Sequence, residues 1–372
     1  MTPLAVPLGP RDPGPVRPDP ARLPAAPTTR FAPAPTGLLH LGHLVNALYV
    51  WGIARASGGR VLLRIEDHDR QRSLRAHEAA LLDDLERLGL LPDTPPLDTL
   101  RAGRSAYRQS DDPAPYEAAA EVLRAQGRVY ACDCPRAAVL AWRGPGCPGS
   151  CGDRGLPEGS PGASLRARLD AGAAGSTADE GDREAFDDLL LGPRDGDPSA
   201  DGDVTLRDRH GNWSYPLCVV VDDARHGVDL VIRGRDLLDA TPRQLRLGRL
   251  LGRARPPAFL HHPLLRKPSS AKLSKADHDT AIRDLLEEGA TPADLLGFAA
   301  AAVGLMDAPR ALPAARLEGL FTTSLRGGCS SVLAPSVSPH FSTSAGPDRR
   351  VAHSNQWTRP PAGVRSRRRH RA

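Results

Sequence analysis

The chain has 372 residues, of which 40% are hydrophobic and 25% charged, and its formal net charge is +5. This composition suits a soluble globular protein with a sizeable core. It excludes a disulfide scaffold, because six cysteines are too few. It also excludes a membrane protein, because no apolar run reaches the roughly 18 residues of a span, and no secretory signal begins the chain. We expect a cytoplasmic protein.

Residues 1–28 contain nine prolines and show no helical or strand periodicity. Proline fixes φ and removes a backbone donor, so such a run favours extended, unpaired backbone. The sequence predicts a disordered leader before the folded region.

Strands and helices alternate between residues 29 and 310. Buried β-branched runs predict strands, and amphipathic segments predict helices. The expected strands are Arg30–Ala32, Arg60–Ile65, Leu217–Val221 and Val228–Arg233, and the expected helices are Leu41–Ala56, His77–Leu88, Tyr116–Gln126, Thr241–Leu251 and Thr280–Glu288. Strands separated by helices imply an α/β fold with a doubly wound parallel sheet.

Two regions break this alternation. The stretch 143–205 is rich in Gly, Asp and Pro, and we expect an insertion from about residue 107 to residue 205. We expect residues 311–372 to form a low-complexity tail. Residues 320–372 hold nine arginines and one aspartate, so this segment carries +8 and the remaining chain −3. A solvated extension explains such a block more simply than an RNA-binding arm.

The segment RFAPAPTGLLHLGH, residues 30–43, opens the folded region as a strand, a turn and a helix start. A helix N-terminus binds phosphate through its unpaired N–H groups and its dipole. Gly42 allows close backbone approach, and His40 and His43 lie three residues apart on one helix face. Two imidazole donors there could stabilise charge on a transferred phosphate. By itself, such a pair is more often an ordinary surface pair.

Only three of the 49 basic residues are lysines, and all three lie between residues 267 and 275. The flexible ammonium of lysine and the rigid fork of arginine are not interchangeable. Lys272 and Lys275 flank the pair Leu-Ser, a spacing that suits a flexible clamp on a polyphosphate. An ordinary basic loop is the alternative, but it does not explain why a chain that otherwise uses arginine has its lysines here.

HLGH at residues 40–43 and KLSK at residues 272–275 together resemble the two signature motifs of class I aminoacyl-tRNA synthetases. The segments RFAPAPTGLLHLGHL and GGRVLLRIEDHDRQR resemble the glutamyl and glutaminyl branch of that class. YPLCVVVDDARHGVDLVIRGRDLLDATPRQ resembles the same branch. Its TPRQ ending resembles the corresponding segment of the glutamyl-queuosine tRNA(Asp) synthetases, the short paralogues of glutamyl-tRNA synthetases. The resemblance covers residues 29–310 and implies a Rossmann-like catalytic domain.

The resemblance assigns a glutamate pocket to one stretch and three further positions. These are Arg30, Phe31, Ala32, Pro33, Ala34, Glu66, Tyr215 and Arg233. Glu66 would bind the substrate ammonium and Arg233 the side-chain carboxylate. The residue types suit glutamate independently, because two carboxylates and one ammonium require two cationic forks and one anion. Glu66 and Arg233 could instead be strand-end ion-pair residues, but ligands of open α/β sheets bind at such strand ends.

The resemblance also implies that ATP, accompanied by Mg²⁺, is bound by His40, Gly42, His43 and Lys275. The residues His40, His43, Lys272 and Lys275 would be catalytic. The glutamate carboxylate would attack the α-phosphorus, and the glutamyl group would then pass to queuosine at the wobble position of tRNA(Asp). No protein nucleophile is needed, since positioning and electrostatic stabilisation suffice.

One residue departs from the family pattern in the expected pocket. The family usually has serine where Ala34 stands. The missing hydroxyl removes one possible hydrogen bond, worth about 0.5–1.5 kcal/mol. We expect weaker substrate binding rather than loss of activity.

Four of the six cysteines form two close pairs, Cys132 with Cys134 and Cys147 with Cys151. Four thiolates make a closed tetrahedral set, which is typical of structural zinc. The resembling family has a tyrosine ligand where Cys147 stands, so a four-thiolate set is a departure. We predict one structural zinc ion per chain, with four packed or free cysteines as the alternative. Of the other two, Cys218 is expected in a core strand and Cys329 in the tail.

Only about 35 patterned residues follow Ala276, so we do not expect the large helical anticodon-binding part of full-length glutamyl-tRNA synthetases. This favours the short paralogue, a monomer that activates glutamate without tRNA. Two alternatives stay open. One is a truncated glutamyl-tRNA synthetase that charges tRNA(Glu), and the other is a non-catalytic paralogue that binds tRNA or nucleotide.

Overall fold

The computed structural model of the chain describes residues 6–142, 147, 150–169, 183–266, 268 and 281–322. The principal helices are α1 (Leu41–Ala56), α2 (Arg75–Arg87), α3 (Leu97–Arg101), α4 (Ala114–Ala125), α5 (Arg136–Ala141), α6 (Cys151–Arg154), α7 (Tyr215–Arg225), α8 (Thr241–Leu250), α9 (Ile282–Glu287) and α10 (Pro292–Ala302). The strands are β1 (Thr28–Phe31), β2 (Arg60–Leu63), β3 (Val129–Cys132), β4 (Ser164–Ala167), β5 (Glu184–Asp188), β6 (Gly192–Gly196), β7 (Val204–Arg207), β8 (Leu230–Gly234) and β9 (Ala258–His262).

Parallel strand pairs form the centre of the fold. β1 pairs with β2, and β9 pairs with both β8 and β5. The carbonyl of Thr28 accepts from the backbone N–H of Asp229 at 3.1 Å, and the Asp229 carboxylate accepts from the Thr28 N–H at 2.8 Å. These two bonds join the start of β1 to the strand β8. The predicted α/β fold with parallel strands is confirmed.

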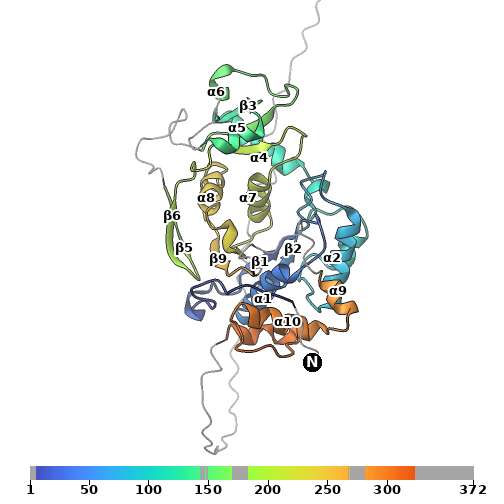
Figure 1. The fold of residues 1–372 in the computed structure, drawn as a ribbon. Helices are drawn as coiled ribbons and strands as arrows, with labels where there is room; N and C mark the ends of the chain where they lie inside the picture. The colour runs from blue at the N-terminus through green and yellow to red at the C-terminus, as the bar shows by residue number, and fades with distance from the viewer. Residues whose placement is uncertain are drawn as a thin grey trace, which may run out of the picture. The chain divides into compact units, whose positions relative to one another are not determined.

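Helices cover these strands on two sides, with α7 and α8 on one side and α1 and α10 on the other (Figure 1). The helix α1 is buried almost all round, since Leu48, Tyr49 and Ile53 have no exposed surface. A helix that is apolar on every face belongs in a core. α1 therefore carries its first residues, including His40 at its N-cap, on a rigid support.

Most expected elements occur with their ends displaced by a few residues, and the helix Leu41–Ala56 has the expected bounds. The expected strand Leu217–Val221 is wrong, because these residues lie in α7. A short β-branched apolar run does not distinguish a strand from a buried helix. Pro216 in the first turn suits a helix start. The burial of the three valines in an apolar cluster stabilises the helix more than their β propensity disfavours it.

The expectation of a disordered leader is wrong for residues 6–27. Val16 and Leu23 pack against the main core. The carbonyls of Pro13 and Pro15 accept hydrogen bonds from the guanidinium of Arg235. Prolines remove donors from the backbone but leave every carbonyl as an acceptor. The leader, which contains one short 3₁₀ helix, Pro20–Arg22, is therefore held mainly by contacts with the folded part.

The expected start of the tail at residue 311 is also wrong, because packed chain continues to residue 322. A 3₁₀ helix, Ala314–Leu320, lies against α1. The ring of Phe321 occupies the space over Gly52, where a Cβ atom would meet it at 2.4 Å. A short 3₁₀ helix has too little periodicity to detect, so the sequence did not reveal this contact. The rest of the expected tail, including Cys329, lies outside the described residues.

Between α4 and α7, the chain forms a separate antiparallel sheet in the order β3-β4-β7. Its strands share a second apolar cluster with α4, α7 and α8 that includes Tyr116, Val204 and Leu217. This sheet lies within the range where an insertion is expected. In the described ranges of the chain, no helix is both long and apolar enough to cross a membrane.

Candidate active site and metal centre

The two histidines of HLGH stand at the start of α1 with their rings 4.0 Å apart. Nδ1 of His40 accepts the Gly42 N–H, and Nδ1 of His43 accepts the His40 N–H, both at 3.1 Å. A neutral imidazole that accepts at Nδ1 carries its proton on Nε2. A Cβ atom on Gly42 would lie 2.9 Å from the His40 ring, so this position requires glycine. Each histidine can thus donate from Nε2 without being charged.

The residue at which the described chain resumes after the lysine stretch contacts the first of these histidines. Lys272 and Lys275 themselves lie outside the described residues. Ala281, where the described chain resumes, forms a β-bridge with His40. Next to it, the Ile282 N–H donates to the Leu39 carbonyl at 2.9 Å. The described chain therefore resumes, six residues after Lys275, at the N-terminus of α1.

The RFAPA stretch and the RIED segment run side by side. The Arg64 N–H donates to the Phe31 carbonyl at 3.0 Å, and the Glu66 N–H donates to the Pro33 carbonyl at 3.2 Å. Phe31 is buried against Trp51, with ring centroids 5.2 Å apart. Parallel pairing of β1 and β2 thus brings Arg30 and Glu66 to the same end of the sheet, with Ala32 and Ala34 in the loop that follows β1.

Arg30 and Arg64 share one carboxylate, that of Asp223 on α7. Nε of Arg30 lies 3.2 Å from both Asp223 oxygens, and Nη1 of Arg64 lies 2.7 Å from Oδ1. Nη2 of Arg64 donates to Glu66 at 2.8 Å. Burial alone would raise the pKa of Asp223, but the two guanidinium groups lower it to about 2. The charge of Arg30 is therefore balanced within the protein.

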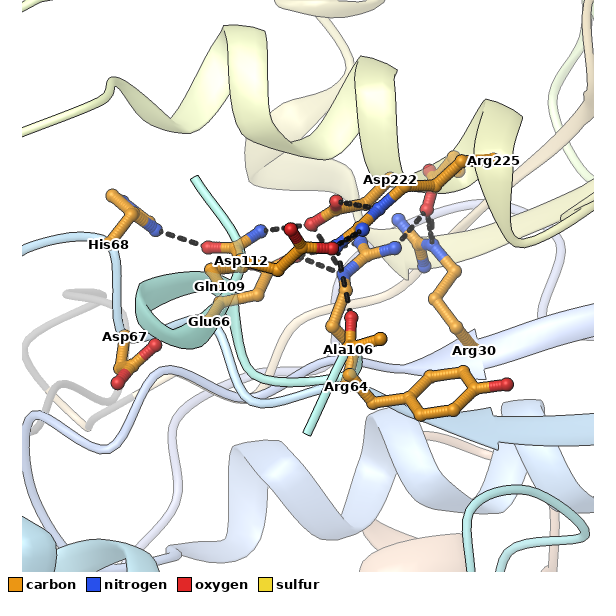
Figure 2. Close-up of polar contacts among 12 residues, drawn as sticks. Arg30, Arg64, Glu66, Asp67, His68, Ala106, Gln109, Asp112, Asp222 and Arg225 are labelled. Atoms are coloured by element: carbon orange, nitrogen blue, oxygen red, sulfur yellow. Dashed lines mark hydrogen bonds and ion pairs between the residues drawn. The ribbon is translucent and has the colours of Figure 1, made fainter. Parts of the chain in front are cut away.

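A second carboxylate, Asp222, organises the other side of this cluster (Figure 2). Gln109 donates from Nε2 to Asp222 at 2.7 Å, and its Oε1 lies 2.8 Å from Nδ1 of His68. Tyr116 and Arg225 also donate to Asp222. Asp222 is fully buried, so these contacts satisfy a charge that would otherwise be costly to bury. The network fixes α7 against the segment that carries His68.

Tyr215 begins α7 close to Arg30, Glu66 and Arg233. Burial raises the pKa of its phenol, and Arg233 and Arg30 partly offset this. The ring lies 6.1 Å from that of His68. Arg233, at the end of β8, is only 4% exposed and hydrogen-bonds to side chains of α8 and β9. The structure thus gathers Arg30, Glu66, Tyr215 and Arg233 from four separate segments.

Several residues of this cluster were not among the sequence candidates. They are Arg64, His68, Gln109, Asp222 and Asp223. One signal was available, because the doublet Asp222-Asp223 ends an apolar run and two adjacent buried carboxylates require cationic partners. A strand continued through this doublet would place the two carboxylates on opposite faces. The helix places both toward the arginines.

The four cysteines Cys132, Cys134, Cys147 and Cys151 come together as predicted. Their Sγ atoms all lie within 4.8 Å of one another, and those of Cys134 and Cys151 are 3.4 Å apart. Tetrahedral zinc–sulfur bonds of about 2.3 Å require sulfur atoms just under 4 Å apart. The cluster therefore fits a metal ion of this kind. Cys218 is buried in α7, not in a strand.

The sequence matches the family described as tRNA synthetases class I (E and Q), catalytic domain, over residues 27–145 and 175–305. A glutamyl-Q tRNA(Asp) synthetase of Symbiobacterium thermophilum is 42% identical over 292 residues, which are 75% of this chain and 87% of that protein. A glutamyl-Q tRNA(Asp) synthetase of Rhodobacter capsulatus is 41% identical over 72% of this chain and 97% of its own length. Glutamate–tRNA ligase 2 of Syntrophus aciditrophicus is 38% identical over 74% of this chain, but only 57% of that ligase is covered.

Among solved structures, a glutamate tRNA ligase from Elizabethkingia meningosepticum, in complex with its amino acid, aligns with a TM-score of 0.62 at 23% identity. The alignment covers 80% of this chain and 65% of that ligase, so this chain spans about two thirds of its length. At this identity the likeness concerns the fold. The sequence match and the relatives together show that the chain belongs to the E and Q family of class I tRNA synthetases and is a ligase of that class.

Proposed function

We propose that the protein activates L-glutamate with ATP and Mg²⁺, without tRNA, and transfers the glutamyl group to queuosine in tRNA(Asp). One observation carries the proposal. Relatives named glutamyl-Q tRNA(Asp) synthetase match this chain over 87% and 97% of their own lengths. The chain thus corresponds to nearly the whole of such an enzyme.

The cluster at the end of β1 and β8 suits glutamate as the amino acid. Glu66 offers a carboxylate for the substrate ammonium, and Arg233 offers a guanidinium for the side-chain carboxylate. Tyr215 is close enough to both for their charges to act on the pKa of its phenol, which Arg233 lowers and Glu66 raises. Arg30 is already paired with Asp223, so we assign it to shaping the pocket rather than to neutralising the substrate.

ATP would lie at the N-terminus of α1. The Nε2–H groups of His40 and His43 would face the phosphates there and stabilise the charge that moves onto pyrophosphate. Lys272 and Lys275, a few residues before Ala281 in the chain, would add their ammonium groups. The glutamate carboxylate attacks the α-phosphorus, the bond to pyrophosphate breaks, and the resulting glutamyl-adenylate carries the activated acyl group.

The second candidate is charging of tRNA(Glu), which is favoured by the similarity to a glutamate–tRNA ligase. Because only 57% of that ligase is covered, we rank it below the first. For the cysteine cluster we propose one zinc ion, held by four thiolates. A closed four-thiolate site leaves no position for substrate, so the ion would brace the antiparallel sheet that contains β3.

The decisive experiment has two parts. ATP–pyrophosphate exchange is measured with glutamate in the absence of any tRNA, and we expect clear exchange. Glutamate transfer is then measured with tRNA(Asp) carrying queuosine, tRNA(Asp) lacking it, and tRNA(Glu). Transfer only to the first supports the proposal. Exchange that requires tRNA, or transfer to tRNA(Glu), would instead establish the second candidate.

A further inference from the structure

Arg233 is held by three side chains from two elements. Its Nε donates to Nε2 of His261 at 3.0 Å, its Nη1 to Oε1 of Gln244 at 2.6 Å, and its Nη2 to Oγ1 of Thr241 at 2.8 Å. Thr241 and Gln244 are the first and last residues of the TPRQ segment and lie three apart on α8, so they share a helix face. All three partners are buried.

His261 is itself held in one orientation by Asp188 on β5. Its Nδ1 lies 2.7 Å from Oδ2 of Asp188, and both residues have no exposed surface. The Nδ1–H of His261 therefore donates to the carboxylate, which leaves Nε2 as the acceptor that faces Arg233. The carboxylate also accepts from the N–H groups of Leu190 and Leu191. A series of hydrogen bonds thus connects Asp188, at the end of β5, through His261 to the guanidinium of Arg233.

The partners of Arg233 differ in charge from those of the neighbouring arginines. Arg30 and Arg64 are paired with carboxylates. In the described part of the chain, the hydrogen-bond partners of Arg233 are an imidazole, an amide, a hydroxyl and the phenol of Tyr215, and a neutral group supplies each of them. A carboxylate in any of these places would neutralise the guanidinium and compete with an acidic ligand. The three contacts fix the orientation of Arg233 and preserve its charge.

The donor count agrees with this arrangement. A guanidinium has five N–H groups, and three are used by His261, Gln244 and Thr241. The two that remain on the terminal nitrogens serve the Tyr215 phenol, which also hydrogen-bonds to this guanidinium, and a substrate carboxylate, for which arginine is a suitable partner. The phenol of Tyr215 lies near the same nitrogens, so a substrate carboxylate would share this position with a neutral neighbour.

We propose that Thr241, Gln244 and His261 form a neutral clamp that positions Arg233 to select an amino acid with a side-chain carboxylate. Residues of the clamp are positioning residues, since they act through Arg233. The inference rests on the proposed function, in which Arg233 binds the glutamate side chain. It assigns the TPRQ segment a task in substrate selection.

The sharpest test is Gln244→Glu, which keeps the shape and the acceptor but adds a negative charge beside Arg233. ATP–pyrophosphate exchange is measured with the full chain, for glutamate and for ATP separately. We expect the KM for glutamate to rise about tenfold or more, because the added carboxylate neutralises Arg233 and weakens its charged hydrogen bond to the substrate, with the KM for ATP unchanged. Gln126→Glu at the C-terminal cap of α4, where the Gln126 amide donates to the Leu250 carbonyl, is the control and should keep the wild-type KM for glutamate.

A second pair of variants separates positioning from simple packing. Thr241→Val removes the acceptor without changing volume and should also raise the KM for glutamate. Thr241→Ser restores the hydroxyl and should return it toward wild type. A wild-type KM for glutamate in Gln244→Glu and Thr241→Val, in protein that exchanges normally, would refute the clamp alone. A wild-type chain that shows no exchange with glutamate would refute the proposed function, and the clamp with it.

Discussion

Arg64 and Glu66, two positions apart on the chain, form a buried ion pair in which Nη2 of Arg64 lies 2.8 Å from Oε1 of Glu66. Arg64 has no exposed surface, and it also contacts Asp223. Burial alone would lower the pKa of this guanidinium, but the surrounding carboxylates hold it well above its usual value. Arg64 thus stays charged and fixes the direction of Glu66, the residue proposed to meet the substrate ammonium.

Glu66→Gln should therefore weaken glutamate binding while leaving the fold intact. The amide keeps the shape and can still accept from Arg64, but it lacks the charge that an ammonium needs. We expect the KM for glutamate to rise by about tenfold to a hundredfold, the range for a hydrogen bond to a charged group. Exchange kinetics measure it, and Glu86→Gln, at an exposed position, is the control. Equal KM values for glutamate in both variants would show that Glu66 does not bind the substrate.

Asp223→Asn should destabilise the protein strongly. Asp223 balances two buried guanidinium groups, and removing one partner of a buried pair costs about 3–5 kcal/mol. Denaturant unfolding followed by circular dichroism measures the loss. Asp187→Asn breaks an exposed pair with Arg22, in which Asp187 is 58% exposed, and should cost less than about 1 kcal/mol. Similar losses in the two variants would contradict the role assigned to Asp223.

Stability should fall as the pH drops from about 6.5 toward 4, partly because of His262. Burial lowers the pKa of this imidazole to about 4, while in the unfolded chain it titrates near 6.5. Between these values the unfolded state binds a proton that the folded state does not, so stability rises with pH by up to about 1.4 kcal/mol per unit.

His262→Gln tests this pH dependence. Nε2 of His262 lies 3.1 Å from the Asn46 amide, and its ring stacks on Tyr49, so the variant should be less stable at pH 7.5. Its unfolding free energy should then approach that of wild type as the pH falls. A difference that stays constant from pH 7.5 to 4.5 would show that His262 does not titrate in this range.

The cysteine cluster predicts about one zinc ion per chain in protein purified without chelator. Metal analysis by mass spectrometry measures the ratio. Cys147→Ser removes one of the four sulfur atoms and should lower both zinc content and melting temperature. Cys218→Ser, in α7 outside the cluster, should keep its zinc. Protein that is well folded and free of zinc would contradict the prediction.

Ala34→Ser should strengthen glutamate binding if the hydroxyl matters at this position. Ala34 lies in the loop after β1, where its carbonyl accepts from the Thr36 N–H. One added hydrogen bond is worth about 0.5–1.5 kcal/mol, so the KM for glutamate should fall by about twofold to tenfold. An unchanged KM would show that serine contributes nothing here.

The sequence revealed the pattern of elements well where periodicity was strong. The helix Leu41–Ala56 has the expected bounds, because an apolar run that long has no competing interpretation. The run Leu217–Val221 was misread, since five residues do not establish a period. The cysteines were also predictable, because close spacing on a chain limits how far their sulfur atoms can separate.

Other parts of the site depended on contacts between distant segments, which local patterns do not encode. Asp223 meets Arg30 across 193 positions of the chain. The sequence suggested two arginines for the substrate, but only the structure shows that one of them is already neutralised. His261 and Asp188 could not be paired beforehand, because their strands lie side by side only after folding.

The leader ties together segments that are far apart in the chain. Arg11 donates to the carbonyl of Ala301, and Arg17 donates to that of Leu320. The phenol of Tyr49, on α1, donates to the carbonyl of Val16. The leader and the 3₁₀ helix Ala314–Leu320 thus both contact α1, so loosening either segment would expose part of this helix to water.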